Sequence, residues 1–391
     1  KDLSDKVPMN RLLEGDVGSG KTAVAAIAAF AAFANGFQTV IMAPTQILAE
    51  QHYATLNELF KDYKVRLSLI TSSTKKSDLG RADVFVGTHA LIHKKISFSN
   101  IALVVIDEQH RFGVEQRAHL VKKSGTPHVL TMTATPIPRT IALTTYGDLD
   151  LSVLTEMPKG RDKITTWTVP PQKRQSAYGW IKKQLAGSKS QVFIICPLIE
   201  ESEKETMEGV KAATEEFRNL KSIFSHFKLG LLHGRLKAKE KEKVLGNFRN
   251  RKIDVLVSTP VVEVGIDIPN ATVMVIEDAE RFGLAQLHQL RGRVGRGNKK
   301  SYCLLFSKIK YSRRLAAMEK THSGFELAEL DLKLRGPGEI FGTRQSGFAE
   351  LKVASWGNYE LIRETRDLAE NIMENPSKFP LVAARLTVLY N

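Results

Sequence analysis

The chain has 391 residues, of which 42% are hydrophobic and 25% charged, proportions typical of a folded globular protein and not of a disordered chain. This length exceeds what one ordinary hydrophobic core holds, so we expect two domains. The longest nearly apolar run, residues 23–34, is too short to cross a bilayer. The formal net charge of +15 favours a polyanionic partner such as nucleic acid, although a merely basic protein would share this composition.

Short apolar runs alternate with helical sequence over the first half of the chain. An Ala-rich helix is predicted after Thr22, and it stops at Asn35 and Gly36, which both tolerate the left-handed conformation. Nearly continuous apolar runs with helices between them predict a parallel sheet that is covered on both faces. The predicted strands are residues 39–43, 84–86, 103–106 and 129–132.

A second alternating series follows residues 156–172, which contain three prolines and a glycine and which we interpret as a connector. Residues 237–250 are predicted to form a solvent-exposed helix of mixed charge. The pattern predicts an α/β fold with domains at 1–155 and 156–310, then a helical region at 311–391 with a Gly-rich loop at 335–347. The predicted strands of the second series are residues 192–196, 231–232, 255–258, 273–276 and 302–306.

The two cysteines, Cys196 and Cys303, each lie in an apolar, strand-like run. This context favours small buried thiols over a disulfide framework or a zinc site, and it is typical of a reducing compartment. Because the chain begins with Lys1 and not with Met, we expect it to be part of a longer protein.

The segment Gly15 to Thr22 (GDVGSGKT) matches the phosphate-loop pattern at every required position. Its glycines allow backbone N–H groups to turn toward phosphate oxygens, Lys21 would contact the outer phosphates, and the Thr22 hydroxyl would hold Mg²⁺. A flexible turn is the alternative. The Ala-rich helix predicted directly after the loop favours the phosphate site.

Two polar segments follow predicted strands, where a parallel sheet presents ligands. One carboxylate of Asp107 and Glu108 can hold Mg²⁺ while its neighbour deprotonates the attacking water. Thr133 and Thr135 could link a nucleotide site to a nucleic-acid backbone, or they could cap a strand. Gln109 and His110 have no metal-ligand spacing around them, which argues against zinc.

In the second half, the segment 289–296 (QLRGRVGR) places Arg291, Arg293 and Arg296 beside two glycines. Guanidinium groups on a closely approaching backbone suit an arginine finger that stabilises a transferring phosphoryl group. A basic patch for a nucleic-acid backbone is the alternative. Residues 265–267 (GID) would form a turn at the face of this domain.

The order GDVGSGKT, APTQILAEQH, GTHALI, DEQH, TATPIPRT, HGRL, STPVVEVGIDIP and QLRGRVGR resembles the motifs of superfamily 2 helicases. DEQHRFGVEQR, CPLIEESE, NATVMVIEDAERFGL and GFELAELDLKLRGPGEIFGTRQSG are similar to the RecG family of bacterial DNA translocases. The Mfd family is the nearest competitor, but it typically has DEEH at residues 107–110 and a different residue at Ser19. The chain departs from the usual RecG pattern at Glu14, Gln46 and Pro260.

The resemblance implies two RecA-like domains that close over ATP and Mg²⁺. Glu108 would activate water, with Lys21, Arg293 and Arg296 as the other catalytic residues, and Thr22 and Asp107 would hold the metal. The remaining nucleotide contacts would be Gly15, Gly18, Ser19, Gly20, Gly265, Asp267 and Gln289. Contacts to DNA, or coupling to it, would come from Thr45, Gln46, Thr88, His89, Gln109, His110, Thr133, Thr135, Arg335, Arg344 and Gln345.

The resemblance further implies a monomeric translocase in the bacterial cytoplasm that remodels stalled forks and Holliday junctions. Its partners would be branched and double-stranded DNA, with single-stranded DNA-binding protein as a further suggested partner. The family's adenine-reading motif and wedge domain would precede Lys1, so we expect ATP hydrolysis with poor fork remodelling. The alternatives left open are an Mfd-like translocase, an RNA-remodelling helicase, a P-loop kinase or small-molecule NTPase, and a non-catalytic nucleic-acid binding module.

Overall fold

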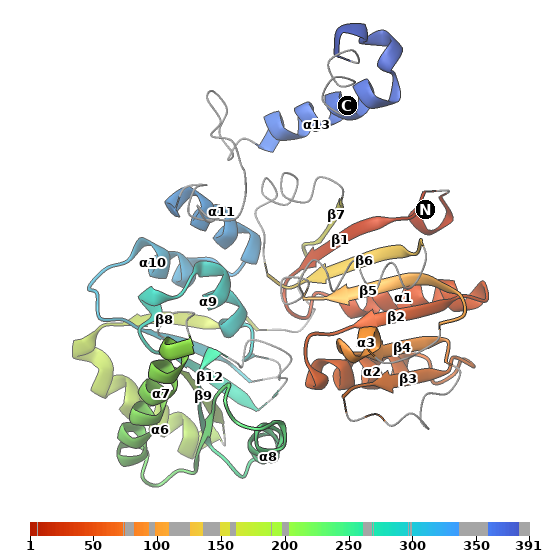
Figure 1. Cartoon of the computed structure of the whole chain (residues 1–391). Helices are drawn as coiled ribbons and strands as arrows, with labels where there is room; N and C mark the ends of the chain where they lie inside the picture. Colours follow the sequence, from red (N-terminus) through yellow and green to blue (C-terminus); the bar gives the residue numbers. More distant parts are fainter. Residues whose placement is uncertain are drawn as a thin grey trace.

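The computed structural model describes residues 1–5, 7–72, 74, 82–93, 98–108, 126–135, 149–156, 162–188, 190–197, 203–260, 268, 270–295, 297, 299–335 and 359–382. Within these ranges the chain forms two parallel sheets and a set of C-terminal helices (Figure 1). No helix in these ranges is long and apolar enough to cross a membrane.

The first sheet has the strand order β3-β4-β2-β5-β6-β1-β7, and every pairing in it is parallel. Its strands are β1 (Asn10–Gly15), β2 (Gln38–Met42), β3 (Leu67–Ile70), β4 (Val84–Gly87), β5 (Ile101–Asp107), β6 (His128–Thr133) and β7 (Asp150–Leu154). The helices of this half are η1 (Asp2–Ser4), α1 (Lys21–Ala34), α2 (Gln46–Leu59) and α3 (Ala90–His93).

The second sheet has the order β10-β11-β9-β12-β13-β8 and is also parallel throughout. Its strands are β8 (Thr165–Val169), β9 (Gln191–Ile195), β10 (Leu229–Leu232), β11 (Val255–Ser258), β12 (Ala271–Ile276) and β13 (Tyr302–Phe306). Its helices are η4 (Pro171–Lys173), α6 (Arg174–Ser188), α7 (Glu203–Ile223), α8 (Ala238–Arg249), η6 (Ala279–Arg281) and α9 (Leu284–Arg291).

The C-terminal elements are α10 (Arg313–Lys320), α11 (Gly324–Arg335), α13 (Tyr359–Glu374) and η7 (Pro376–Lys378). Figure 1 shows α10 and α11 beside α9 of the second domain, whereas α13 projects away from both sheets. The helical region predicted after residue 311 therefore begins against the second domain.

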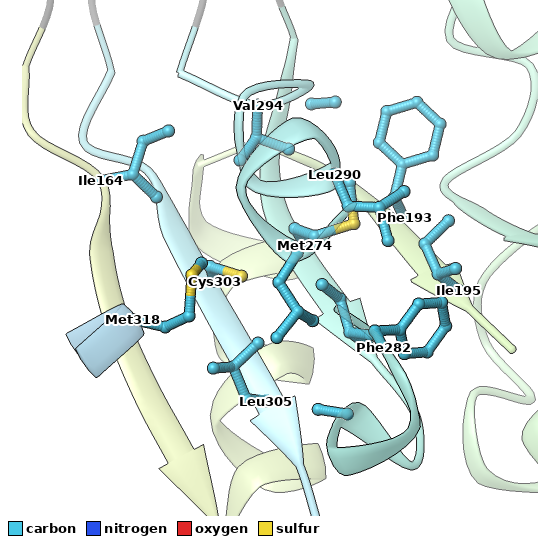
Figure 2. Packing of buried hydrophobic residues seen from close by; sticks show 14 of the residues in the cluster. Ile164, Phe193, Ile195, Met274, Phe282, Leu290, Val294, Cys303, Leu305 and Met318 are labelled. Carbon is cyan, nitrogen blue, oxygen red and sulfur yellow. The ribbon is translucent and has the colours of Figure 1, made fainter. Parts of the chain in front are cut away.

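Buried leucines hold α9 on the second sheet. Leu284, Leu287 and Leu290 recur at a helical spacing and pack in one cluster with Phe193 and Met274 (Figure 2). Each such leucine contributes about 1.5–3 kcal/mol through burial of its apolar surface. This packing fixes the position of Arg291, which ends α9, and of Arg293, which lies just beyond it. Both are candidate site residues.

The α/β class and the two parallel sheets are confirmed. The helix after the phosphate loop runs from Lys21 to Ala34 and ends as predicted, with Asn35 as its C-cap and Gly36 at a φ of 78°. Cys196 and Cys303 are buried free thiols, and burial raises the pKa of Cys303 to about 12.

The segment interpreted as a connector, residues 156–172, contains a strand that the apolar pattern did not predict, because β8 lies within it and pairs with β13. The sequence TTWTV has no apolar run, because threonines alternate with Trp167 and Val169. β-branched and aromatic residues nevertheless suit an edge strand of this kind. The strands β1, β3 and β7 were missed for a similar reason, since charged or polar residues interrupt them.

Candidate nucleotide site and interdomain seam

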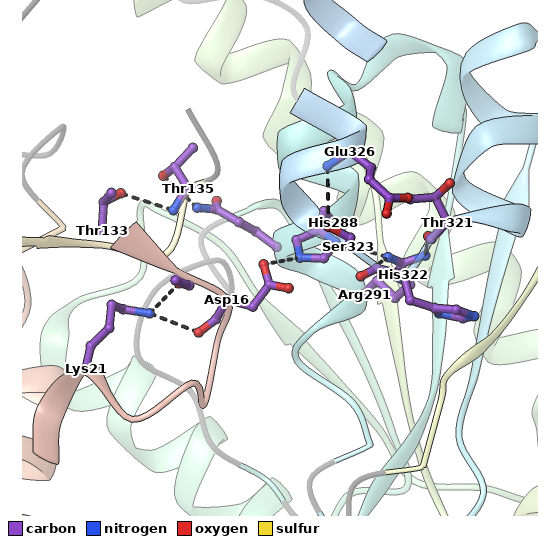
Figure 3. A network of polar contacts seen from close by, with 12 residues as sticks. Asp16, Lys21, Thr133, Thr135, His288, Arg291, Thr321, His322, Ser323 and Glu326 are labelled. Atoms are coloured by element: carbon purple, nitrogen blue, oxygen red, sulfur yellow. Dashed lines mark hydrogen bonds and ion pairs between the residues drawn. The ribbon is translucent and has the colours of Figure 1, made fainter. Parts of the chain in front are cut away.

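The phosphate loop joins β1 to α1 at the carboxyl edge of the first sheet. Gly18 and Gly20 adopt φ values of 86° and 96°, a region that favours glycine. Lys21 Nζ donates hydrogen bonds to the carbonyl oxygens of Gly15 (2.6 Å) and Asp16 (3.0 Å), so its ammonium lies over the loop (Figure 3). The loop therefore brings the Lys21 ammonium and the first N–H groups of α1 to the same place, where an anion such as a phosphate could bind.

Asp107 and Glu108 follow at the end of β5, and both side chains are buried. The Glu108 N–H donates to Asp107 Oδ1 at 3.0 Å, and Glu108 itself has a φ of 52°. Burial, followed by the charge of Asp107, raises the pKa of the Glu108 carboxyl, while Lys21, Arg293 and the Ala134 N–H oppose this rise. A carboxylate with a raised pKa is a stronger base and suits proton removal from water.

His52 holds the second oxygen of Asp107. Its Nε2 lies 2.7 Å from Asp107 Oδ2, and both side chains are buried. A carboxylate can only accept, so Nε2 is the donor. His52 lies on α2, whose first turn is capped by Thr45 through the Leu48 N–H (3.3 Å). One hydrogen bond thus joins α2 to Asp107 at the end of β5.

Arg293 reaches this site from the second domain. It lies directly beyond the C-terminal end of α9 and is only 5% exposed. Burial lowers the pKa of Lys21 and the charge of Arg293 adds to that, whereas Asp107, Glu108 and Asp16 oppose it. Arg293 is therefore close enough to Lys21 and Glu108 to act on both electrostatically.

A second contact between the domains joins Gln289 to the first sheet. Gln289 Nε2 donates to Thr135 Oγ1 at 2.8 Å, and the Thr135 N–H donates to Thr133 Oγ1 at 3.1 Å (Figure 3). Ile47 of α2 also packs against the core of the second domain. The two domains meet along a seam that includes the phosphate loop, α2 and the end of β6.

The residues fit a nucleoside triphosphate with Mg²⁺. Among the residues that the structure describes, the Ser19 hydroxyl oxygen is buried in the loop without a hydrogen-bond partner. Lys21, Asp107 and Glu108 influence one another electrostatically, which places a cation and two carboxylates together. This is the donor and acceptor set that phosphate oxygens and a hard cation require.

Family models match three successive regions of the chain. These are the DEAD/DEAH box helicase at residues 6–144, the helicase conserved C-terminal domain at residues 176–298, and the C-terminal part of domain 3 of the ATP-dependent DNA helicase RecG at residues 321–386. The ATP-dependent DNA helicase RecG of Synechocystis sp. is 51% identical over 392 residues, covering 96% of this chain and 47% of that protein. The chain belongs to the RecG family.

Among solved structures, RecG bound to a three-way DNA junction aligns with a TM-score of 0.75 at 43% identity, over 92% of this chain and 48% of that one. The chain spans about half the length of the RecG proteins that it matches. S. cerevisiae Dbp5 bound to RNA and ADP BeF3 aligns with a TM-score of 0.61 at 21% identity, a likeness of fold alone. The Mfd-like and RNA-remodelling alternatives are not favoured.

The other predicted RecG-family site residues lie as follows. Gln46 opens α2 and its Nε2 donates to Glu50 Oε1 at 2.9 Å. Thr88 is buried after β4, and the neighbouring His89 is exposed. Arg335 ends α11, and its side chain lies outside the described part of the chain, as do Arg296, Gly265, Asp267, Gln109, His110, Arg344 and Gln345. A nucleotide contact for Gln289 stays a prediction, because its amide meets Thr135 in this structure.

Arg291 has a different environment from the one we inferred for the three arginines together. Its Nη1 donates to the carbonyl oxygens of Met318 (2.8 Å) and Thr321 (2.9 Å), and its Nη2 donates to His322 O at 3.3 Å. A buried guanidinium needs such acceptors, and these carbonyls supply them. Arg291 thus ties α9 to the segment that leads into α11.

Removal of the His52 donor is expected to weaken the predicted metal site at Asp107. In the variant His52→Leu, Asp107 loses the group that orients its carboxylate, so Mg²⁺ affinity or ATPase activity falls about 10- to 100-fold. His52→Gln retains a donor nitrogen and restores most of this loss. The measurement is the Mg²⁺ concentration for half-maximal ATPase, with thermal unfolding as the control for folding. Equal Mg²⁺ dependence in the Leu and Gln variants would show that His52 has only a packing role.

Proposed function

We propose that the chain is the motor of an ATP-dependent DNA translocase that moves on duplex DNA and remodels branched DNA. The observation that carries this proposal is the contact between the domains, where Gln289 Nε2 donates to Thr135 Oγ1 at 2.8 Å and the approach of the buried Arg293 brings its charge to bear on Lys21 and Glu108. An NTPase that works with one domain has no need of this approach. A motor needs it, because hydrolysis must depend on domain closure.

The residues divide the reaction between the two domains. The phosphate loop and Lys21 bind the triphosphate, with Thr22 and Asp107 as the proposed metal ligands. Mg²⁺ held by these two residues would supply positive charge that offsets the negative charge of the phosphate oxygens. Glu108 accepts a proton from the attacking water, and its raised pKa favours this transfer. Arg293 places positive charge where the transferred phosphoryl group becomes more negative.

Contacts between the domains make this reaction sensitive to closure. Gln289 and Thr135 meet across the seam at 2.8 Å, next to the proposed arginine finger. If the domains separate, Arg293 leaves the first domain and the site loses its transition-state charge. Cycles of closing and opening would move the C-terminal helices relative to the first sheet, and we propose that this displaces DNA.

The same proposal includes several finer assignments that rest on the family resemblance. These are Mg²⁺ as the metal, a cytoplasmic location in bacteria, a monomeric state, and single-stranded DNA-binding protein as a partner. The proposal also includes the nucleotide-binding and DNA-binding roles of the predicted site residues. Its domain limits are 1–155, 156–310 and 311–391. The formal charge of +15 supports a polyanionic partner.

ATP hydrolysis by the 391-residue chain is expected to rise when DNA is added. The assay compares no nucleic acid, linear duplex DNA, a three-way DNA junction and duplex RNA at one ionic strength. We expect stimulation by both DNA forms, little by RNA, and a steep loss of stimulation with added salt, since phosphate contacts release counterions. A rate that is equal with and without DNA would favour a small-molecule NTPase and overturn the proposal.

A further inference from the structure

The side chain of Asp16, in the phosphate loop, contacts the second domain and the C-terminal helices at two points. His288 Nε2 lies 2.9 Å from Asp16 Oδ1, and the Gly324 N–H also donates to this carboxylate. The side chain of His288 is 8% exposed and that of Asp16 is 16% exposed, so their contact is shielded from water. Nothing in the chemistry of phosphate binding requires an acidic side chain here, because the loop uses backbone N–H groups and a lysine.

Asp16 meets the first turn of α11. Gly324 begins that helix, and the first N–H groups of a helix have no acceptor within it. A carboxylate at this end satisfies one such donor and interacts favourably with the helix dipole. Burial alone would raise the pKa of Asp16, but His288, the Gly324 N–H and Lys21 together lower it. The carboxylate is therefore held in its charged form.

Gly324 leaves no room for a side chain at this contact. A Cβ at this position would lie 2.4 Å from Asp16 Oδ1 and 2.9 Å from His288 Nε2. Both distances are too short for non-bonded atoms, so a larger residue would displace the Asp16 carboxylate and the His288 ring from their present contacts. The contact of Asp16 with His288 and with the start of α11 thus depends on glycine at this position.

The orientation of His288 is fixed from its other side. Its Nδ1 lies 3.0 Å from Arg291 Nη2, and a guanidinium can only donate. Nδ1 is therefore the acceptor, and Nε2 carries the hydrogen that it donates to Asp16. Since Arg291 also binds the carbonyl oxygens of Met318 and Thr321, the loop, α9 and the start of α11 form one hydrogen-bonded unit (Figure 3).

Asp16 also touches the residue that would respond to nucleotide. Its carbonyl oxygen accepts from Lys21 Nζ at 3.0 Å, while its carboxylate binds His288 and Gly324. When Lys21 turns to a phosphate, the Asp16 carbonyl loses this donor. A cavity of 540 Å³, lined by Asp16 and His288 together with Phe325 of α11, lies beside the contact and gives the helix room to move.

We propose that Asp16 is a positioning residue that transmits the state of the phosphate loop directly to α11, through His288 and the Gly324 N–H. This link rests on the proposed motor function, and it is separate from the path through Arg293. It makes the movement of the C-terminal helices depend on the loop itself as well as on domain closure. Loss of the link uncouples DNA movement from ATP hydrolysis.

The test uses Gly324→Ala, which changes no group that contacts phosphate, metal or water. The matched control is Gly246→Ala in α8, where a new Cβ meets nothing within 4 Å. Two quantities are measured: DNA-stimulated ATP hydrolysis, and displacement of a third strand from a triplex as the motor passes. We expect Gly324→Ala to retain DNA-stimulated hydrolysis. The amount of strand displaced per ATP hydrolysed should fall at least about tenfold, and a tenfold fall corresponds to about 1.4 kcal/mol of coupling.

A second pair of variants covers the case in which Gly324→Ala does not fold, which thermal unfolding reports. His288→Leu removes the donor to Asp16, and His288→Gln keeps an amide donor. We expect a low displacement per ATP for the Leu variant and recovery for the Gln variant. Displacement per ATP equal to that of Gly246→Ala, failure of Gln to recover it, or loss of DNA-stimulated hydrolysis itself would each overturn the link. If the unaltered chain shows no DNA stimulation, the motor proposal fails instead.

Discussion

Glu108→Gln is expected to lower kcat for ATP hydrolysis by about 10²- to 10⁴-fold, because an amide cannot accept the proton that a carboxylate takes from water. The replacement has nearly the same shape, so the end of β5 and the contact with the Ala134 N–H should survive. Lys21 and the phosphate loop are unchanged, and ATP binding should therefore persist. Steady-state hydrolysis with saturating DNA measures the first effect, and binding of a fluorescent ATP analogue measures the second.

Glu277→Gln is the matched control for this change. Glu277 is also buried directly after a strand, and burial raises the pKa of its carboxyl to about 7. It pairs with Arg174 at 2.7 Å in the second domain, away from the phosphate loop. The control variant should lose thermal stability, since Arg174 loses the nearer of its two carboxylate partners, Glu277 and Glu216, but it should keep its kcat. Hydrolysis by Glu108→Gln at the unaltered rate would refute the assignment of Glu108 as the base.

The sequence predicted the strands that are continuous apolar runs, and it failed for β3, β7 and β8 at the sheet margins and for β1, whose apolar residues are flanked by polar ones. Strands β9 and β12 contain continuous apolar runs at residues 192–195 and 273–276, so composition alone locates them. The strand β8 lies at the edge of its sheet and alternates buried and exposed residues, and threonines occupy most of its positions. Its strand character comes from pairing with β13, which the local sequence does not encode.

Sequence motifs also located the parts of the site whose chemistry is fixed by spacing along the chain. The phosphate loop and the acidic pair are of this kind. His52 and His288 are not, because each is a lone histidine on a helix whose partner lies far away in sequence: Asp107 in one case and Asp16 in the other. Such contacts depend on how the helices pack. Arg291 is the last residue of α9 and Arg293 lies beyond the helix end, so the two arginines have different environments.

Arg293→Lys is expected to lower DNA-stimulated kcat by about 10³- to 10⁵-fold, the usual contribution of an arginine finger to phosphoryl transfer. Lysine keeps the charge, but its single ammonium lacks the planar set of donors that reaches two phosphate oxygens at once. The change should leave KM for ATP almost unaltered, because the contact strengthens only in the transition state. The exposed Arg249→Lys, at the end of α8, is the control and should be neutral.

The same variant decides between the two roles that the arginine-rich segment allows. If Arg293 bound the DNA backbone, Arg293→Lys would raise the DNA concentration needed for half-maximal activation, and saturating DNA would restore kcat. A finger role predicts the opposite split, with kcat reduced at every DNA concentration and the activation midpoint unchanged. Because Arg293 is buried and its charge acts on both Lys21 and Glu108, we expect the second result. Domain closure would then be a condition for hydrolysis, as a motor requires.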